Sequence, residues 1–348
     1  MHRYSQRASR RLRPFALAAL LAAVSALALP ASSLGQESAQ LGDAKPYTPV
    51  KAIDFSPKHD VMIRNADGTL TPMDVPHYTS KVIAPGVWRI ESDGDFHYLI
   101  EGDKEALAID TGYGAGNLRD YLQTLTKKPV RMVANTHDHF DHTANNGYFD
   151  RAYMSAETAK KATIPFPSFA GIKFPEGYPR IIVGDGYKFD LGNREVEVFL
   201  IPNHTAGGTA YLDSKSRILF SGDEVMGANE PLNVSVAQFA ANMRKLEARR
   251  NAFDRLAGGP GIFDASTVDK YLAAAEAVLA GKEGAVPPAR PGRGLGAAPA
   301  DPSAPVVYVR HTVRAPDRPP TMGAPNDNLR SMASQDVRIT YDLRHIQN

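Results

Sequence analysis

The 348-residue sequence contains no cysteine. Disulfides and thiolate metal ligands are therefore excluded, and a metal site would have to be built from histidine, aspartate and glutamate. A lipid anchor on a cysteine is excluded as well. An oxidising compartment would pose no hazard to such a chain.

The apolar run at residues 15–29 is too short for an ordinary membrane span. Five arginines precede it, and small residues from Ala31 to Gly35 follow it. This order is typical of a secretory signal. We therefore expect residues 1–35 to be a cleaved export signal, which leaves a periplasmic or secreted protein without a membrane anchor.

The net positive charge disappears once this signal is set aside. The formal net charge is +2, and removing five arginines and no acids gives 2 − 5 = −3. An acidic mature chain gives no case for nucleic acid as a partner. Residues 284–348 carry eight arginines and five aspartates, a balance of 8 − 5 = +3. We expect this basic tail to pack on the acidic body or on a second copy in a homo-oligomer.

Twenty-six prolines and 28 glycines indicate a loop-rich α/β or β-rich protein. The composition along the chain predicts an N-terminal extension with one or two short strands at 36–80 and a catalytic domain at 81–283. A Pro/Gly-rich linker follows at 284–305, and a β-containing tail occupies 306–348.

Periodicity within the catalytic domain predicts strands alternating with helices. Strands are expected at 86–90, 96–100, 105–109, 130–134, 181–183, 195–201, 209–212 and 217–220. Helices are expected at 115–126, 236–253 and 267–279, the last with Ser266 as its N-cap, and a short strand and helix at 151–162. Residues 163–180 are rich in proline and aromatics. They suit either a surface loop pinned by its own side chains or an apolar flap over a pocket.

Side chains that can bind metal or take part in catalysis are concentrated in His137-Asp-His-Phe-Asp-His142, which lies shortly after the strand expected at 130–134. Imidazoles and carboxylates at this density are rarely buried unless they are paired or bound to metal. His204 and Asp223 each follow another expected strand, so these ligands can meet at one edge of a sheet layer. Catalytic zinc sites typically use three protein ligands and leave a position open for water.

The six-residue motif resembles the HxHxDH signature of the metallo-β-lactamase superfamily. The resemblance covers about residues 82–280 and continues through Asp110-Thr-Gly112, Pro202-Asn-His204-Thr205 and Ser221-Gly-Asp223. It implies an αββα sandwich of two mixed sheets flanked by helices. It also implies roles for single residues: His137, His139 and His204 hold one zinc ion, Asp141 and His142 hold a second, Asp223 bridges the two, and Asp110 supports the metal loop.

One position departs from the family pattern. The family usually supplies a last ligand from a Gly-His-Gly turn, whereas this chain reads Gly259-Pro260-Gly261. The resemblance therefore implies a weakened second zinc site or a single-ion enzyme. His311 and Asp264 are the candidates for a replacement ligand.

The reading that follows is an exported zinc-dependent hydrolase acting on an ester, lactone, thioester or amide/lactam bond of a small molecule. Asp141 is expected to orient the attacking hydroxide. Tyr113 is either a hydrogen-bond donor to the oxyanion or a packing residue. One alternative is a periplasmic β-lactamase. Others are a non-catalytic binding protein and an iron-dependent redox member of the same fold, although nothing in 284–348 resembles a flavin domain.

Overall fold

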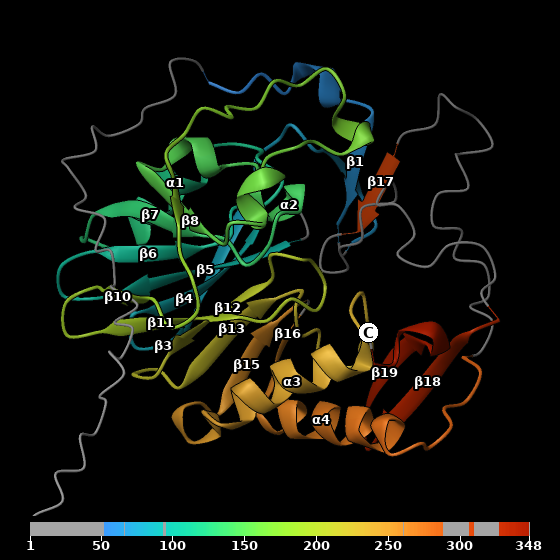
Figure 1. Ribbon diagram of the computed structural model, residues 1–348. Helices are drawn as coiled ribbons and strands as arrows, with labels where there is room; N and C mark the ends of the chain where they lie inside the picture. The colour runs from blue at the N-terminus through green and yellow to red at the C-terminus, as the bar shows by residue number, and fades with distance from the viewer. Residues whose placement is uncertain are drawn as a thin grey trace, which may run out of the picture. The chain divides into compact units, whose positions relative to one another are not determined.

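Two mixed β-sheets form the centre of the computed structural model, which describes residues 52–65, 67–92, 95–259, 261–287, 306–309 and 327–347 (Figure 1). Among these residues, the first sheet has seven strands in chain order. Its strands β3 to β6 pair antiparallel, and β6 to β9 pair parallel. The strands are β3 (Tyr78–Ala84), β4 (Val87–Ser92), β5 (Asp95–Glu101), β6 (Ala106–Ile109), β7 (Val130–Ala134), β8 (Arg151–Met154) and β9 (Arg180–Ile182).

The second sheet has six strands within the same described residues. All its pairs are antiparallel except β13 with β15. In sheet order the strands are β10 (Lys188–Asp190), β11 (Glu195–Leu200), β12 (Thr209–Asp213), β13 (Ile218–Gly222), β15 (Arg255–Gly258) and β16 (Gly261–Asp264).

The two sheets pack face to face through a shared apolar core. Tyr98 of β5 lies against Phe220 of β13, with ring centroids 4.9 Å apart. The sequence of strand β6 is apolar throughout because both faces of the strand are buried. Leu107 and Ile109 join the core between the sheets, whereas Ala106 and Ala108 join the core on the opposite face.

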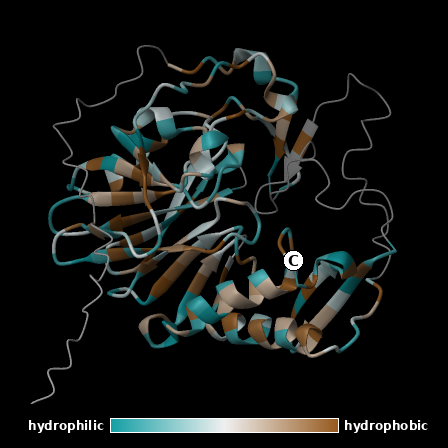
Figure 2. Ribbon diagram, in the orientation of Figure 1, coloured by the Kyte–Doolittle hydropathy of each residue, from teal (hydrophilic) through white to brown (hydrophobic). Residues whose placement is uncertain are grey.

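Helices cover the outer faces of both sheets. Helix α1 (Leu118–Leu125) packs on the first sheet, and α3 (Val236–Glu247) and α4 (Ser266–Leu279) pack on the second. Figure 2 shows hydrophobic residues along the strands of the sheets and along α3 and α4. The expected αββα sandwich is therefore confirmed.

The C-terminal tail is part of this body. Strand β14 (Asn229–Pro231) pairs with β19 (Val337–Asp342), which pairs with β18 (Leu329–Ser334). Met332, Ile339 and Tyr341 are buried in the same core as α3 and α4. The tail thus packs on the chain's own body, and its use in a homo-oligomer stays a prediction.

The N-terminal extension contributes two short strands, β1 (Val61–Arg64) and β2 (Leu70–Pro72). Strand β17 (Val306–Val309) pairs with β1 in parallel, so a segment that follows the catalytic domain in sequence joins the N-terminal extension in one small sheet. The expected signal at 1–35 and residues 288–305 of the expected linker lie outside the described residues. Within the described part, no helix is both long and apolar enough to cross a membrane.

Helix boundaries differ from the sequence expectations for local reasons. Helix α1 begins only at Leu118, because Gly116 has a φ of +71° and Asn117 caps the helix by accepting a hydrogen bond from the Asp120 amide. Helix α3 ends at Glu247, and Arg250–Ala252 forms a 3-10 turn instead.

Two further expectations about helices are wrong. Ser266 is the first residue of α4 and not its N-cap, since Asp264 Oδ1 accepts the hydrogen bond of the Ser266 amide. The helix expected before Ala162 is a 3-10 turn, Thr158–Lys160.

Residues 163–180 are held down by their own aromatic side chains. Phe169 and Phe174 are buried against Phe140, which lies inside the six-residue motif. Their ring centroids lie 4.9 Å and 4.6 Å from that of Phe140. The segment therefore packs against the loop at residues 137–142, as expected of a loop that is pinned by its own side chains.

A buried ion pair ties the two sheets together. Arg194 Nε lies 3.2 Å from Asp213 Oδ2, and both side chains are at most 3% exposed. The same guanidinium donates hydrogen bonds to the carbonyls of Pro85, Gly86 and Glu101 on the first sheet. Asp213→Ala leaves this cation buried without its partner.

We therefore expect Asp213→Ala to lower the free energy of unfolding in urea by about 3–5 kcal/mol. Asp254→Ala, which removes the exposed partner of Arg217, is the matched control and should change stability little. Equal midpoints for both variants would show that the buried pair does not stabilise the sandwich.

Candidate metal centre

Three histidines from two loops converge at one end of the sandwich. His137 and His139 follow β7, and His204 follows β11. The Nε2 atoms of His137 and His204 each lie 3.1 Å from His139 Nδ1. Three ring nitrogens that face one another in this way suit a shared cation.

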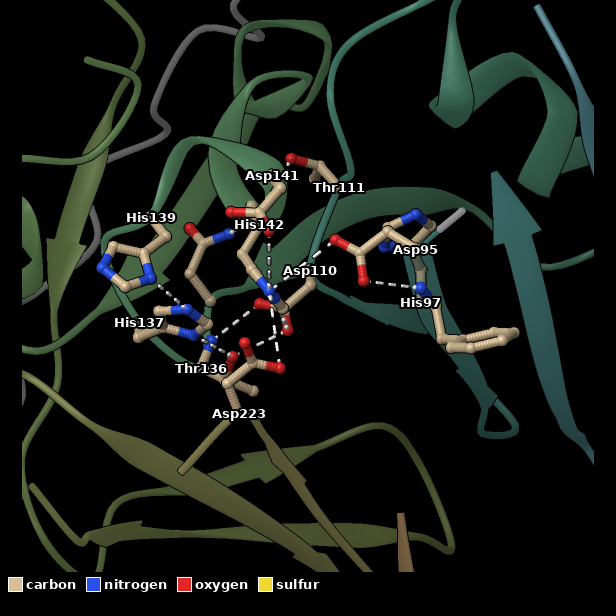
Figure 3. Close-up of polar contacts among 12 residues, drawn as sticks. Asp95, His97, Asp110, Thr111, Thr136, His137, His139, Asp141, His142 and Asp223 are labelled. Carbon is tan, nitrogen blue, oxygen red and sulfur yellow. Dashed lines mark hydrogen bonds and ion pairs between the residues drawn. The ribbon is translucent and has the colours of Figure 1, made fainter. Parts of the chain in front are cut away.

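A second group of donors surrounds His142, in the short helix α2 (Phe140–Thr143). Its Nε2 lies 3.7 Å from Asp95 Oδ2, 3.8 Å from Asp141 Oδ2 and 3.9 Å from Asp223 Oδ1 (Figure 3). Asp223, just past β13, also places its Oδ2 3.8 Å from His204 Nε2. One carboxylate therefore reaches both groups.

Asp110 fixes the orientation of the second group. Its Oδ2 accepts hydrogen bonds from His142 Nδ1, at 2.9 Å, and from Thr136 Oγ1, at 2.7 Å (Figure 3). Its Oδ1 accepts the Thr136 amide at 2.7 Å. Because the Asp110 carboxylate accepts a hydrogen bond from Nδ1, that nitrogen carries a proton, and Nε2, which faces the three aspartates, is the nitrogen that could bind an ion.

Burial and charge act together at this centre. Burial alone would lower the pKa of His142, but the negative charges of Asp95, Asp110 and Asp141 outweigh it and hold the pKa well above its usual range. Burial raises the pKa of Asp95 strongly, with His142 opposing it. Burial and the charge of His142 lower the pKa of His97 to about 3, so that this ring is neutral. The centre thus concentrates negative charge where a cation would be favourable.

These residues fit zinc by their chemistry. The donors are imidazole nitrogens and carboxylate oxygens, and within the described residues they fall into three overlapping groups with donor atoms within 4.8 Å of one another. His137, His139 and His204 offer only nitrogens. The other two groups share His142, which one combines with His137 and Asp223 and the other with Asp95 and Asp141.

The sequence profile described as "Metallo-beta-lactamase superfamily" matches residues 96–290, more than half of the chain. The chain belongs to the metallo-β-lactamase superfamily. The match includes the six-residue motif, His204 and Asp223, and it begins one residue after Asp95.

The curated relatives cover smaller parts of the chain. It is 29% identical over 160 residues to the acyl-coenzyme A thioesterase MBLAC2 of Homo sapiens, covering 37% of this chain and 57% of that one. It is 34% identical over 124 residues to the hydroxyacylglutathione hydrolase of Rhodospirillum rubrum, covering 34% and 44%. A solved metallo-beta-lactamase from Pontibacter korlensis is 18% identical with a TM-score of 0.45, covering 57% and 99%. The chain spans about half the length of the curated relatives named here.

Glu224 is a buried carboxylate that the sequence reading missed. Its Oε2 accepts the amides of Asn203 and His204, both at 2.7 Å. Its Oε1 accepts the amide and hydroxyl of Thr205. Burial raises the pKa of Glu224 to about 8, although these donors favour the ionised form. The side chain positions the loop that carries His204.

Asp95 is the second residue that the sequence reading missed. It was part of an expected turn between two strands, where an acid is ordinary. The structure makes it the first residue of β5 and turns its buried side chain towards His142. The pairing of β5 with β6, which ends next to Asp110, brings it there.

The replacement ligands considered for the second site fare differently. Asp264 is exposed, and its Oδ1 accepts the Ser266 amide. It belongs to none of the donor groups found among the described residues. Pro260 and His311 lie outside the described residues.

Tyr113 lies in the aromatic cluster behind the metal loop. It is fully buried, and its ring stacks on Phe169 with centroids 5.6 Å apart and an interplanar angle of 7°. This placement matches the packing alternative. Its catalytic role stays a prediction that one variant can test.

We expect Tyr113→Phe to keep kcat/KM within about threefold of the unmodified enzyme, because a packing ring needs no hydroxyl. Loss of an oxyanion donor would instead cost about 10²–10³-fold in kcat. Steady-state kinetics on the best substrate of the panel described below distinguishes the two.

Proposed function

We propose that this chain is a zinc-dependent hydrolase of an ester, lactone, thioester or amide/lactam bond in a small molecule. The observation that carries the proposal is the set of adjoining donor groups, with Asp223 close to both His142 and His204. The hydrolases among its relatives support the same reaction class. A bound zinc ion lowers the pKa of its water to about 7 and polarises a substrate carbonyl.

Several residues of the chain hold the donor side chains in place for this reaction. Asp110 holds His142 in one tautomer, and Glu224 holds the loop of His204. Asp141 lies beside His142 with its side chain 2% exposed. We assign to it the task of accepting a hydrogen bond from the attacking water and so orienting that water towards the carbonyl.

Thioesters are the first substrates to test. Acyl-coenzyme A is a thioester, and hydroxyacylglutathione carries the same bond, so the names of two relatives point to this class. The remaining classes differ in the leaving atom, and one panel can cover them.

The panel uses protein that is stripped with a chelator and then loaded with zinc or, separately, with Fe²⁺. The substrates are an acyl-coenzyme A, S-lactoylglutathione, an acyl lactone, a p-nitrophenyl ester and nitrocefin. We expect zinc-dependent hydrolysis of at least one acyl substrate. A zinc-loaded protein that hydrolyses none of them would overturn the proposal. Hydrolysis of nitrocefin alone would favour the β-lactamase alternative.

Export is a separate proposal, supported by the arginine-rich start, the apolar run and the small residues that follow. We expect the protein made in a bacterial host to reach the periplasm or medium with a new N-terminus near residue 36. N-terminal sequencing of the fractionated protein tests this. A cytoplasmic protein that begins at residue 1 or 2 would contradict it.

A further inference from the structure

One carboxylate oxygen of Asp95 makes no hydrogen bond to the part of the chain that the structure describes. Its side chain is 9% exposed, and Oδ1 accepts the Phe96 amide at 2.8 Å. Oδ2 is buried without a hydrogen-bond partner among the described residues. Figure 3 shows the carboxylate of Asp95 directed towards His142, and the Oδ2–Nε2 distance is 3.7 Å.

This distance suits two ligands of one ion better than a direct contact. A hydrogen bond between nitrogen and oxygen measures about 2.7–3.2 Å, so the two groups are not hydrogen-bonded. Zinc with bonds of about 2.0–2.2 Å holds neighbouring nitrogen and oxygen ligands about 3–4 Å apart. The distances from His142 Nε2 to Asp95, Asp141 and Asp223 are 3.7, 3.8 and 3.9 Å.

The charges around His142 point the same way. Asp95, Asp141 and Asp223 bring three carboxylates to one face of a single imidazole, whose other nitrogen is already bonded to Asp110. Carboxylates brought together in a buried place repel one another unless a cation offsets their charge. A divalent ion at the centre of these donors would supply that charge.

The position that the family resemblance assigns to a further ligand holds Pro260, whose side chain has no donor atom. Asp264, which the sequence offered as a replacement ligand, is exposed, and its Oδ1 accepts a hydrogen bond from the Ser266 amide. Within the described residues, Asp95 is the additional acid that joins His142 and Asp141 in a donor group.

We propose that Asp95 is a ligand of the second metal ion and completes a site with Asp141 and His142, while Asp223 lies between this site and the three-histidine group. This inference rests on the proposed function, since it assumes a metal centre at this place. The second site is then not deficient. It is a site with two carboxylates and one imidazole, and oxygen-rich sets of this kind accept Mn²⁺ more readily than sets made of imidazole alone.

Asp95→Asn tests this assignment because it keeps the shape of the side chain and the acceptor for the Phe96 amide while removing the charge. Metal content is measured by elemental analysis after equilibration in zinc buffers. We expect two zinc ions per unmodified chain and one per Asp95→Asn chain, with second-site affinity lowered by at least about tenfold. The signal of bound Mn²⁺ in electron paramagnetic resonance should fall in parallel.

Two control variants locate the loss. Asp103→Asn changes an exposed acid just beyond β5 and should keep both ions. His139→Asn removes a ligand of the first group only and should lose the other ion while retaining Mn²⁺ binding. An Asp95→Asn protein that keeps both ions with unchanged affinity would overturn the proposal.

If the Asp95→Asn variant does not fold, a measurement on the unmodified chain still tests the assignment. A crystal structure of the zinc-loaded protein should place an ion about 2.2 Å from Asp95 Oδ2. An ion bound to His142 but not to Asp95 would refute the assignment. Neither measurement needs a substrate, so a protein inert in the hydrolysis panel can still confirm Asp95. If the protein is a hydrolase but its Asp95→Asn variant holds both ions, the assignment of Asp95 as a ligand is wrong and the proposed function stands.

Discussion

Asp141→Ala is expected to lower kcat/KM by about 10²–10⁴-fold for every substrate that the unmodified protein hydrolyses. The side chain lies within 3.8 Å of His142 Nε2, on the same side as Asp95 and Asp223. Its loss removes both the acceptor that orients the attacking water and one carboxylate of the second donor group. Initial rates on the zinc-loaded variant measure the effect.

The two contributions of Asp141 are separable. If the residue acts only as a ligand, excess zinc should restore the rate, whereas a lost orienting group is not restored. Glu176→Ala, which changes an exposed acid in the loop at 163–180, is the control and should leave kcat/KM unchanged. An Asp141→Ala enzyme with the full rate at ordinary zinc concentration would remove Asp141 from the mechanism.

Glu224→Ala is expected to lower the free energy of unfolding by about 3 kcal/mol or more. The substitution takes the acceptor away from the buried amides of Asn203 and His204 and from the partly buried amide of Thr205. Each buried donor left without a partner costs about 1–3 kcal/mol. His204 also loses its support, so zinc affinity of the three-histidine group should fall by about 10–100-fold.

Urea unfolding of the metal-free protein and zinc titration measure these two effects separately. Glu276→Ala, which breaks an exposed pair with Arg244, should cost at most about 1 kcal/mol and leave zinc affinity unchanged. A Glu224→Ala protein as stable as this control would show that the His204 loop holds itself without the carboxylate.

The candidate ligands that the sequence revealed share one property: they follow the ends of strands. His137 to His142 are adjacent in sequence, so their chemistry is visible without the fold. His204 and Asp223 follow apolar strands, and the resemblance to a known motif order connects them. The two-sheet sandwich was predicted from the same resemblance, whereas the apolar strands and the turns between them predicted only the order of strands and helices.

Asp95 and Glu224 could not be found in this way. A single acid in a turn, or next to another acid, is usually solvated, and only strand pairing decides otherwise. Asp95 reaches the centre because β5 pairs with β6. Glu224 becomes buried because the loop after β11 folds over it, and Gly208 leaves the room: a Cβ there would lie 2.1 Å from Glu224 Oε2.

The hairpin of β15 and β16 was missed because its sequence looks like a loop. Gly258, Gly259 and Gly261 are poor strand formers taken alone. A side chain at Gly258 would lie 2.0 Å from the Val225 carbonyl, so close packing against the neighbouring loop requires glycine there. Strand β18 was missed as well, because it lacks β-branched residues. The packing of Met332 against the core of α3 and α4 sets its conformation instead.

The most direct test of a metal-dependent hydrolase at this centre is a zinc titration of the chelator-stripped protein, with bound zinc and hydrolysis followed in the same samples. The structure predicts no acyl hydrolysis in the metal-free protein, recovery as the three-histidine group fills, and saturation at two ions per chain. Hydrolysis that persists undiminished in protein shown to be metal-free would contradict the account.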